Sequence, residues 1–419
     1  MNTKISFKNI DFIIFFVTGF LILIGLINIY SSEFNLGNNK ILEFQSNYGK
    51  QFMWLIISFL IFIIIFLIDA RIIINSAYFI YAITIILLLA TLVVGKEIAG
   101  SKSWLSIGSY SLQPSEFAKF GVALVLAKYL NTYNVNVSRF KDSMIAFGLI
   151  LLPMILIILQ NDIGSALVFV AFIFVLFRYG LSPLFLLIPF ISAILFIVVL
   201  LINIYWVIAF LVLVALIIFF LSSKKVKTLV LLVAILAVTT GFLFSVDYAF
   251  NNFLQPHQQT RINVLLGKEV DLRGSGYNIH QSLIAIGSGG FSGKGFLKGT
   301  QTRFDFIPEQ STDFIFCTVA EEYGFLGSIL LISLFVVLML RIIYLSEKQK
   351  FDFIRIYGYG VISVIFIHFI VNLGMTLGIF PVIGIPLPFI SYGGSSLLGF
   401  SIMISVYLKF ISDYSHYYN

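Results

Sequence analysis

Two carboxylates, Glu309 and Asp313, stand together in the stretch FIPEQSTDFIF, residues 306–316, between runs of phenylalanine and isoleucine. A carboxylate in such a place can act as a general base that takes a proton from an attacking hydroxyl. A simpler interpretation is that Ser311 or Thr312 caps a helix and that Asp313 lies in its first turn, where the helix dipole stabilises an anion by ~0.5 kcal/mol. The spacing alone leaves both interpretations open.

A second polar cluster lies in GSKSWLSIGSYSLQPSEFAKF, residues 100–120. Pro114 suits the first turn of a helix, and Glu116 and Lys119 follow it three residues apart on one helical face. An ionisable pair one turn inside a membrane costs a few kcal/mol unless it is paired or wet. The pair therefore indicates either a cavity that opens to the outside or a self-neutralising salt bridge.

Several other polar or aromatic residues have simple structural explanations. Asp162, in QNDIG, is expected to cap the helix that follows it. His368 and Asn372, four residues apart in one span, are expected to form hydrogen bonds between helices rather than a metal pair. Trp104 is of a type that most often lies at the membrane interface.

The elements that must position these residues are membrane helices. The 419-residue chain is 60% hydrophobic and only 11% charged, which excludes an ordinary soluble globule. Its apolar runs are about 18 to 25 residues long, as a membrane-spanning α-helix requires. The single cysteine, Cys317, excludes an internal disulfide. The net charge of +7 includes no basic stripe interleaved with aromatic residues, so nucleic acid is not an expected partner.

We expect an all-α polytopic membrane protein with about twelve spans in a single transmembrane domain, residues 1–419. The expected spans are 12–31, 52–69, 75–95, 114–131, 143–159, 163–179, 183–202, 205–222, 228–247, 325–343, 354–374 and 391–411. Lys and Arg gather in alternate short loops, which places both termini in the cytoplasm. The loops then expected outside are 32–51, 96–113, 160–162 and the long segment 248–324.

The long loop 248–324 is the expected place for chemistry, since loops of this length are usually functional or disordered. Its Arg261 and Lys294 could bind a phosphate, although solvated loop charges are the simpler explanation for either residue. Its glycine-rich run GSGGFSGKG, residues 287–295, is not a nucleotide P-loop, because Gly295 replaces the Ser or Thr that holds magnesium.

Six motifs of the chain resemble those of one bacterial family. They are WLSIGSYSLQPSEFAK, QNDIGSALV, QQTRINVLL, GSGYNIHQSLIAIGSGGFSGKGFLKGTQ, FIPEQSTDFIFCTVAEEYG and VNLGMTLGIFPVIGIPLPFISYGGSS. They follow the order of the SEDS family of cell-wall proteins (shape, elongation, division and sporulation), also called the FtsW/RodA/SpoVE family. The chain is similar to its RodA branch in particular, on the strength of IGSGGFSGKGFLKGTQ and PVIGIPLPFISYGG.

The resemblance implies a peptidoglycan glycosyltransferase that polymerises lipid II in the bacterial cytoplasmic membrane, beside a class B penicillin-binding protein that crosslinks the glycan strands. The family's essential aspartate is the one in TDFIF, here Asp313, which implies that this residue deprotonates the acceptor hydroxyl. Cations must offset the charge of the departing undecaprenyl pyrophosphate, and Mg²⁺ or Mn²⁺ is a further candidate for this. The residues that we expect to bind substrate are Trp104, Glu116, Lys119, Arg261 and Lys294.

The sequence departs from the family pattern at several positions. Ser103 replaces the usual arginine before Trp104, and the neighbouring Lys102 indicates a cation shifted by one position. Asn161 stands where proline is usual. The family has ten spans, and the two surplus spans lie near 205–247. Because an added helix pair preserves parity, the long loop stays on the outer side.

Two other functions stay open. A flippase for lipid-linked precursors would also need cations for a pyrophosphate, but transporters usually have internal repeats and charges near the bilayer midplane, and the chain has neither. A scaffold that only recruits the penicillin-binding protein would not need the intact motif around Asp313.

Overall fold

The computed structural model describes residues 10–34, 46–98, 100–108, 110–222, 225–252, 254, 256–266, 268, 275–304 and 306–414. Both chain termini and parts of the predicted long loop therefore lie outside the described residues. The chain forms two compact units, residues 1–181 with 277–419, and residues 182–276.

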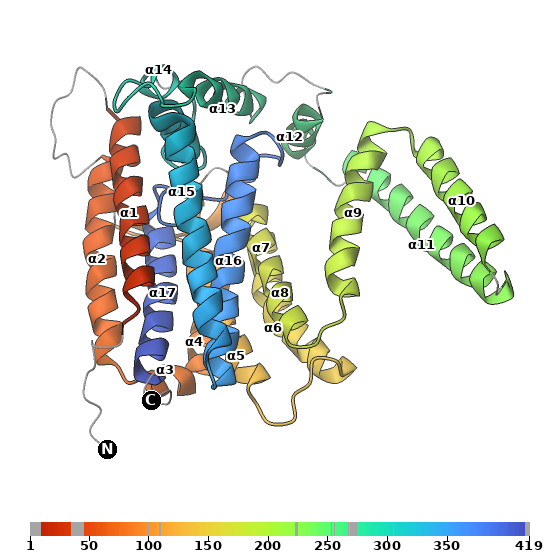
Figure 1. The fold of residues 1–419 in the computed structure, drawn as a ribbon, viewed down its shortest axis with the longest axis horizontal. Coiled ribbons are helices and arrows are strands. Elements are labelled where there is room, and N and C mark those ends of the chain that lie inside the picture. Colours follow the sequence, from red (N-terminus) through yellow and green to blue (C-terminus); the bar gives the residue numbers. More distant parts are fainter. Residues whose placement is uncertain are drawn as a thin grey trace. The chain divides into compact units, whose positions relative to one another are not determined.

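Helices dominate both units, as predicted. The helices of the first unit are α1 (Phe12–Ser32), α2 (Asn47–Leu67), α3 (Ala70–Asn75), α4 (Ala77–Val94), α5 (Pro114–Leu130), α6 (Phe140–Leu159), α7 (Ile163–Val168), the 3-10 turn η2 (Phe169–Ala171), α8 (Phe172–Arg178), α13 (Ser275–Gly289), α14 (Thr300–Arg303), α15 (Ile315–Glu347), α16 (Asp352–Thr376) and α17 (Gly394–Tyr414). The second unit holds α9 (Leu184–Leu201), α10 (Ile204–Leu221), α11 (Lys225–Asn252) and α12 (Pro256–Leu265). In the first unit α13 and α14 lie across one end of the upright helices, and we call this the loop end (Figure 1).

Ten helices of the described residues are long and apolar enough to cross a membrane, as expected for a multi-pass membrane protein. Each coincides with one of the predicted spans. The predicted count of twelve is not confirmed, because the other two predicted spans, 114–131 and 163–179, lie on shorter helices. The first is α5, with 17 residues, and η2 divides the second into α7 and α8.

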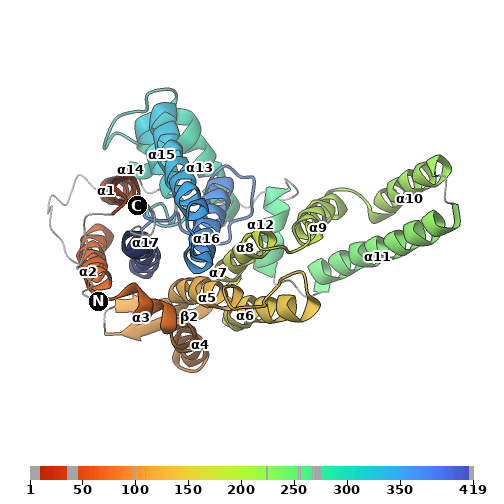
Figure 2. The same cartoon turned by 60° about the horizontal axis from the view of Figure 1, so that its bottom comes forward.

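The core of the first unit lies around α5, α16 and α17. In α16 and α17 the apolar stretches are 78% and 83% buried, whereas no other long helix exceeds 33%. Small residues allow the central helices to approach each other: a Cβ on Gly360 of α16 would lie 3.2 Å from Ala123 of α5. Figure 2 shows α17 near α1, α2 and α16, and it packs against α2, α5 and α16.

A small antiparallel sheet precedes α5 and was not predicted. Its strands β1 (Lys96–Ile98), β2 (Ser101–Ile107) and β3 (Tyr110–Leu112) pair in chain order. The Lys102 ammonium at its start donates to the carbonyls of Leu92 and Val93, at 3.0 and 3.1 Å, and so caps the end of α4. Lys102, the cation next to Ser103, therefore stabilises the end of α4 in this structure.

Gly324 directly precedes the expected span 325–343, which by itself is long enough to cross a membrane, and this predicts a helix break at Gly324. Helix α15 is broken there. This residue has φ 64° and ψ −154°, and a Cβ there would lie 2.3 Å from the Gly293 nitrogen, so only glycine fits. The break leaves backbone groups of α15 without helical partners, and the run 287–295 binds them: the Phe325 N–H, for example, donates to the Gly290 carbonyl at 2.9 Å. The glycine-rich run is thus the backbone partner of the kink.

Basic residues that were predicted to face the cytoplasm form ion pairs at the end opposite the loop end. These pairs are Arg178–Glu347, Arg341–Asp11, Arg355–Asp352 and Lys409–Asp413. The first pair joins α8 to α15 and the second joins α15 to the start of α1, whereas the other two lie within α16 and within α17.

Candidate active site

Asp313 is half-buried in a loop whose backbone is fixed by three hydrogen bonds. The carbonyl oxygens of residues 311, 312 and 313 accept from the Tyr392 N–H, the Ser391 hydroxyl and the Asn372 side-chain amide, at 2.8, 2.6 and 2.8 Å. These donors come from α16 and from the segment before α17. Two distant parts of the chain therefore fix the position of this aspartate.

The prediction that Ser311 or Thr312 caps a helix is wrong. Helix α15 begins at Ile315 and has no side-chain cap, so Asp313 precedes the helix instead of lying in its first turn. The carbonyls of residues 311–313 are engaged by α16 and its following loop, which holds this stretch in a non-helical conformation.

The Asp313 carboxylate faces the backbone of the segment between α16 and α17. Gly384 in this segment has φ +72°, and a Cβ on it would lie 3.5 Å from Asp313 Oδ2. A Cβ on Gly164, at the start of α7, would lie 2.2 Å from the carbonyl oxygen of Ile383. Gly164 leaves no room for a side chain beside Ile383, and Gly384 lies within contact distance of Asp313, so the QNDIG motif and the GIPLP motif meet next to Asp313.

Lys119 and Glu116 form a buried ion pair on α5, 2.7 Å long, with 1% and 3% of their side chains exposed. Of the two earlier alternatives, the self-neutralising salt bridge describes this geometry. The Lys119 ammonium also lies 2.9 Å from His368 Nε2 and 5.1 Å from the centre of the Phe400 ring. An ammonium has three donors, so Glu116 and His368 leave one donor for a ligand.

Helix α16 links this ion pair to Asp313. His368 Nδ1 lies 3.0 Å from the Pro386 carbonyl oxygen, so Nδ1 carries the proton and Nε2 accepts from Lys119. One turn further along α16, the Asn372 amide donates to the carbonyls of both Asp313 and Ile385, each at 2.8 Å. The prediction of hydrogen bonds between helices is confirmed for His368, which contacts Lys119 of α5, whereas Asn372 bonds to main-chain carbonyls outside the helices. The link that α16 makes between Lys119 and the main chain of Asp313 was not predicted.

Asp162 caps α7, as predicted, by accepting from the Ser165 N–H at 3.0 Å. Its second oxygen accepts from the Gln113 side chain at 2.8 Å, and the Gln113 N–H donates to the Ser395 hydroxyl at the start of α17. The start of α5 is thus tied to α7 and α17. This arrangement fixes the depth at which Glu116 and Lys119 lie.

Of the other three candidate residues, two have described side chains in the first unit. The Lys294 ammonium lies 2.7 Å from both Glu321 and Thr300. Trp104 is half-buried on β2. Arg261 lies on α12 in the second unit, and its side chain is outside the described part of the chain. Their predicted roles in substrate binding stay predictions.

Glu321 is a functional candidate that the sequence reasoning missed. Its side chain is fully buried and accepts from Lys294, from the backbone N–H groups of residues 300–302 and from two threonine hydroxyls. The neighbouring Glu322 accepts from Ser31 and from the Leu297 N–H. The one available signal was the pair of glutamates in AEEYG, just before the predicted break in an apolar helix.

We expect Glu321→Gln to loosen the segment 294–303 and to lower the unfolding temperature of the protein. The amide cannot accept as many hydrogen bonds, and it leaves Lys294 without a counter-charge. The loss of one partner of a buried pair costs roughly 3 kcal/mol or more. Thermal unfolding in detergent and limited proteolysis of this segment measure the effect.

Glu309→Gln is the matched control, because Glu309 is exposed in the same region. If Glu321→Gln resists the protease as well as Glu309→Gln does, the role given to Glu321 is contradicted.

Tyr392 donates its backbone N–H to the carbonyl of residue 311, in the loop around Asp313. Burial raises the pKa of its phenol, and the charge of Glu33 adds to this effect. The phenol therefore stays protonated at neutral pH and is a poor base.

A family model for cell cycle proteins, FtsW/RodA/SpoVE, matches residues 11–210 and 191–416, and the chain belongs to this family. The peptidoglycan glycosyltransferase MrdB of Escherichia coli (strain K12) is 36% identical over 336 residues, which cover 79% of this chain and 77% of that protein. The peptidoglycan glycosyltransferase RodA of Treponema pallidum is 32% identical over 415 residues, 93% of this chain and 94% of that protein. The FtsW of Buchnera aphidicola is 27% identical, so the predicted similarity to the RodA branch is confirmed.

Solved structures share the fold. A chain from a structure reported as "Structural coordination of polymerization and crosslinking by a peptidoglycan synthase complex" matches with a TM-score of 0.68 and 25% identity, over 97% of this chain and 99% of that chain. RodA of Thermus thermophilus matches with a TM-score of 0.63 and 25% identity, over 97% of this chain and 98% of that chain. The helical architecture is therefore that of RodA.

Proposed function

We propose that the chain is a peptidoglycan glycosyltransferase that joins lipid II units into glycan strands during cell elongation and the maintenance of rod shape. The observation that carries this proposal is the placement of Asp313, whose backbone is held by three hydrogen bonds and which α16 links to the buried Lys119. Relatives of the same family that are named peptidoglycan glycosyltransferase support the choice of reaction.

In this reaction Asp313 takes the proton from the 4-hydroxyl of the acceptor GlcNAc. The freed oxygen attacks the anomeric carbon of the donor MurNAc, and the bond from that carbon to undecaprenyl pyrophosphate breaks. A single displacement inverts the anomeric configuration. Lys119 directs its remaining donor to the pyrophosphate, where charge increases as the bond breaks, and Glu116 holds the ammonium in place.

The remaining roles extend the same proposal. Arg261 and Lys294 add positive charge near the pyrophosphate, and Trp104 lines the cavity for the sugar. The described residues contain no group of three or more His, Cys, Asp or Glu side chains that could hold a metal ion. If Mg²⁺ or Mn²⁺ takes part, Asp313 would be the residue that holds it beside the pyrophosphate. Such an ion would supply further charge stabilisation.

The proposed location is the bacterial cytoplasmic membrane, with the loop end on the outer side, where lipid II displays its sugars. The ion pairs at the opposite end supply the basic residues that cytoplasmic loops prefer. The proposed partner is a class B penicillin-binding protein, which crosslinks the strands that this chain makes. The solved complex that coordinates polymerization with crosslinking supports such a pairing.

The two rival functions are less well supported. A flippase needs a charged path across the bilayer, whereas Asp313 precedes α15 at the loop end and Lys119 lies within the first two turns of α5. A scaffold has no use for a fixed carboxylate next to a buried cation.

The test is glycan-chain formation from labelled lipid II by the purified protein with its penicillin-binding partner, whose transpeptidase is blocked. We expect chains that lengthen with time, and none from the partner alone. Lipid II that binds but is never polymerised would favour the flippase or the scaffold.

A further inference from the structure

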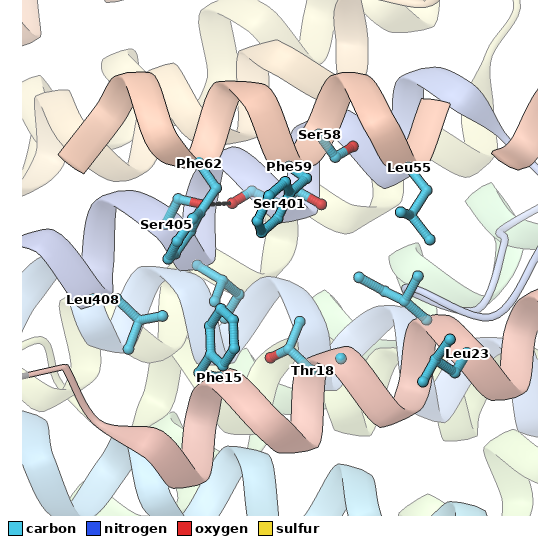
Figure 3. A pocket seen from close by; sticks show the side chains of 13 residues that line it. Phe15, Thr18, Leu23, Leu55, Ser58, Phe59, Phe62, Ser401, Ser405 and Leu408 are labelled. Carbon is cyan, nitrogen blue, oxygen red and sulfur yellow. Dashed lines mark hydrogen bonds between the residues drawn. The ribbon is translucent and has the colours of Figure 1, made fainter. Parts of the chain in front are cut away.

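A groove of about 250 Å³ opens between α1, α2 and α17 in the first unit (Figure 3). It arises because α1 packs mainly on α15 while α2 packs on α17. Phe15, Leu23, Leu55 and Phe59 are among the apolar side chains around it. Gly19 adds room, since a Cβ there would meet no atom within 4 Å.

Four hydroxyls line this groove, those of Thr18, Ser58, Ser401 and Ser405. Ser58 donates to the Trp54 carbonyl at 2.8 Å, and Ser405 donates to the Ser401 carbonyl at 2.5 Å, so both bond within their own helices. The buried Thr18 hydroxyl has no hydrogen-bond partner among the described residues. The walls are therefore mostly apolar, and Thr18 offers a buried spare donor. An empty apolar space of this size is unfavourable, so a hydrocarbon chain fills it in a membrane.

The depth of the groove restricts which lipid chain can fill it from the loop end. Leu23 and Phe15 lie nine and 17 residues below Ser32, at the loop end of α1. At the rise of an α-helix, the groove therefore extends from roughly 14 to roughly 26 Å below that end. The hydrocarbon core is about 30 Å thick, so a phospholipid chain anchored at the loop end stops near its middle, where the groove begins. Only a much longer chain reaches from the loop end into the groove.

The loop end of α2 is joined to the backbone that holds Asp313. The Gln51 side chain, one turn above Leu55, accepts from the Gly393 N–H at 3.2 Å and donates to the Ser391 carbonyl at 3.4 Å. The Ser391 hydroxyl in turn donates to the carbonyl of residue 312. The α2 wall of the groove is therefore connected, one turn above Leu55, to the segment that holds Asp313.

We propose that this groove binds the distal part of the polyprenyl chain of the lipid-linked sugar substrate, an inference that rests on the proposed function. The polyprenyl chain is long enough, and its double bonds can accept a weak hydrogen bond from Thr18, which a saturated acyl chain cannot. The competing occupant is the acyl chain of a phospholipid anchored at the opposite end of the helices.

The first test compares substrates with long and short tails. Gly19→Leu fills the groove, and Gly148→Leu is the matched control, because Gly148 on α6 also has no atom within 4 Å of an added Cβ but lies outside the groove. We expect Gly19→Leu to raise KM for undecaprenyl lipid II roughly tenfold and to leave KM for a short neryl-tailed analogue unchanged. The control should change neither value. Equal changes in KM for both tails, or no change for either, would overturn the proposal.

The second test does not depend on catalysis. The full-length protein in lipid nanodiscs is photolabelled with undecaprenyl phosphate that carries a diazirine at the far end of its chain. A phosphatidylglycerol with the diazirine at the end of an acyl chain serves as the second probe. We expect the polyprenyl probe to label α1, α2 and α17 in the wild type and in Gly148→Leu, but not in Gly19→Leu. Equal labelling of these helices by the phospholipid would overturn the assignment, whereas loss of polymerisation in the wild type would contradict only the proposed function.

Discussion

Asp313→Asn is expected to lower the rate of glycan polymerisation by at least about two orders of magnitude while leaving the fold intact. A positioned general base contributes between ~10² and ~10⁴ in rate, and an amide cannot replace it. The three hydrogen bonds that hold this loop end on main-chain carbonyls, and an asparagine retains them. The measurement is the initial rate of chain formation from labelled lipid II, for wild type and variant side by side.

The control for this experiment is Glu309→Gln, which removes a carboxylate four residues away on the exposed side of the same loop. We expect it to polymerise at close to the wild-type rate. Both variants should also unfold at the same temperature as the wild type. If Asp313→Asn polymerises normally, Asp313 has no part in the reaction, and if it unfolds early, the carboxylate is needed for the fold.

We expect non-additive effects of Lys119→Ala and Glu116→Ala on stability and on polymerisation. The losses of the two single variants should add up to more than the loss of the double variant. Both side chains are almost completely buried, so removal of one leaves an uncompensated charge, at a cost of roughly 3 to 5 kcal/mol. Removal of both takes away that penalty, and the two changes should therefore couple by at least ~1 kcal/mol. A double-mutant cycle of unfolding temperature and polymerisation rate measures this coupling.

The ion pair Arg178–Glu347 is the matched control for that cycle, because its side chains are 56% and 42% exposed. We expect almost no loss of stability when either partner is replaced, since exposed pairs contribute little. Additive effects at Lys119 and Glu116 would mean that they do not act as a pair. Lower polymerisation with unchanged stability in Lys119→Ala alone would assign its charge to the substrate rather than to the fold.

Interactions within a few residues of one another could be predicted from the sequence. The cap that Asp162 forms on α7 and the ion pair between Glu116 and Lys119 span three residues each. The break at Gly324 follows from a glycine inside an apolar run. The family motifs identified Asp313 as the residue to examine. Local spacing is sufficient in these cases because a helix fixes which neighbours face each other.

Contacts between distant residues could not be predicted in this way. Asn372 and the Asp313 carbonyl are 59 residues apart, and Lys119 and His368 are 249 residues apart. No periodicity in one sequence connects such positions. For the same reason the cap at Ser311 or Thr312 was wrong, because contacts with α16 and the segment before α17 override the local preference.

The predicted count of about twelve spans is not confirmed, for a different reason. Hydropathy identified twelve apolar segments, but it does not detect where a helix ends or breaks, so α5 and the pair α7–α8, which are shorter than the other ten helices, were counted with them. The departure at Asn161 changes the backbone conformation. This residue has φ 59°, whereas a proline ring fixes φ near −65°. The turn before α7 therefore has a backbone conformation that the usual proline cannot adopt.

Because His368 and Asn372 lie on one helix, α16 fixes the distance between the two points of the site that they hold. Four residues of α-helix, about 6 Å along the axis, set the offset between the point that holds the cation and the point that holds the aspartate. If a partner or a thinner bilayer tilts α16, both points move together and their separation stays constant. Such a tilt changes how deep the pair lies relative to the substrate and keeps the internal alignment of the two points.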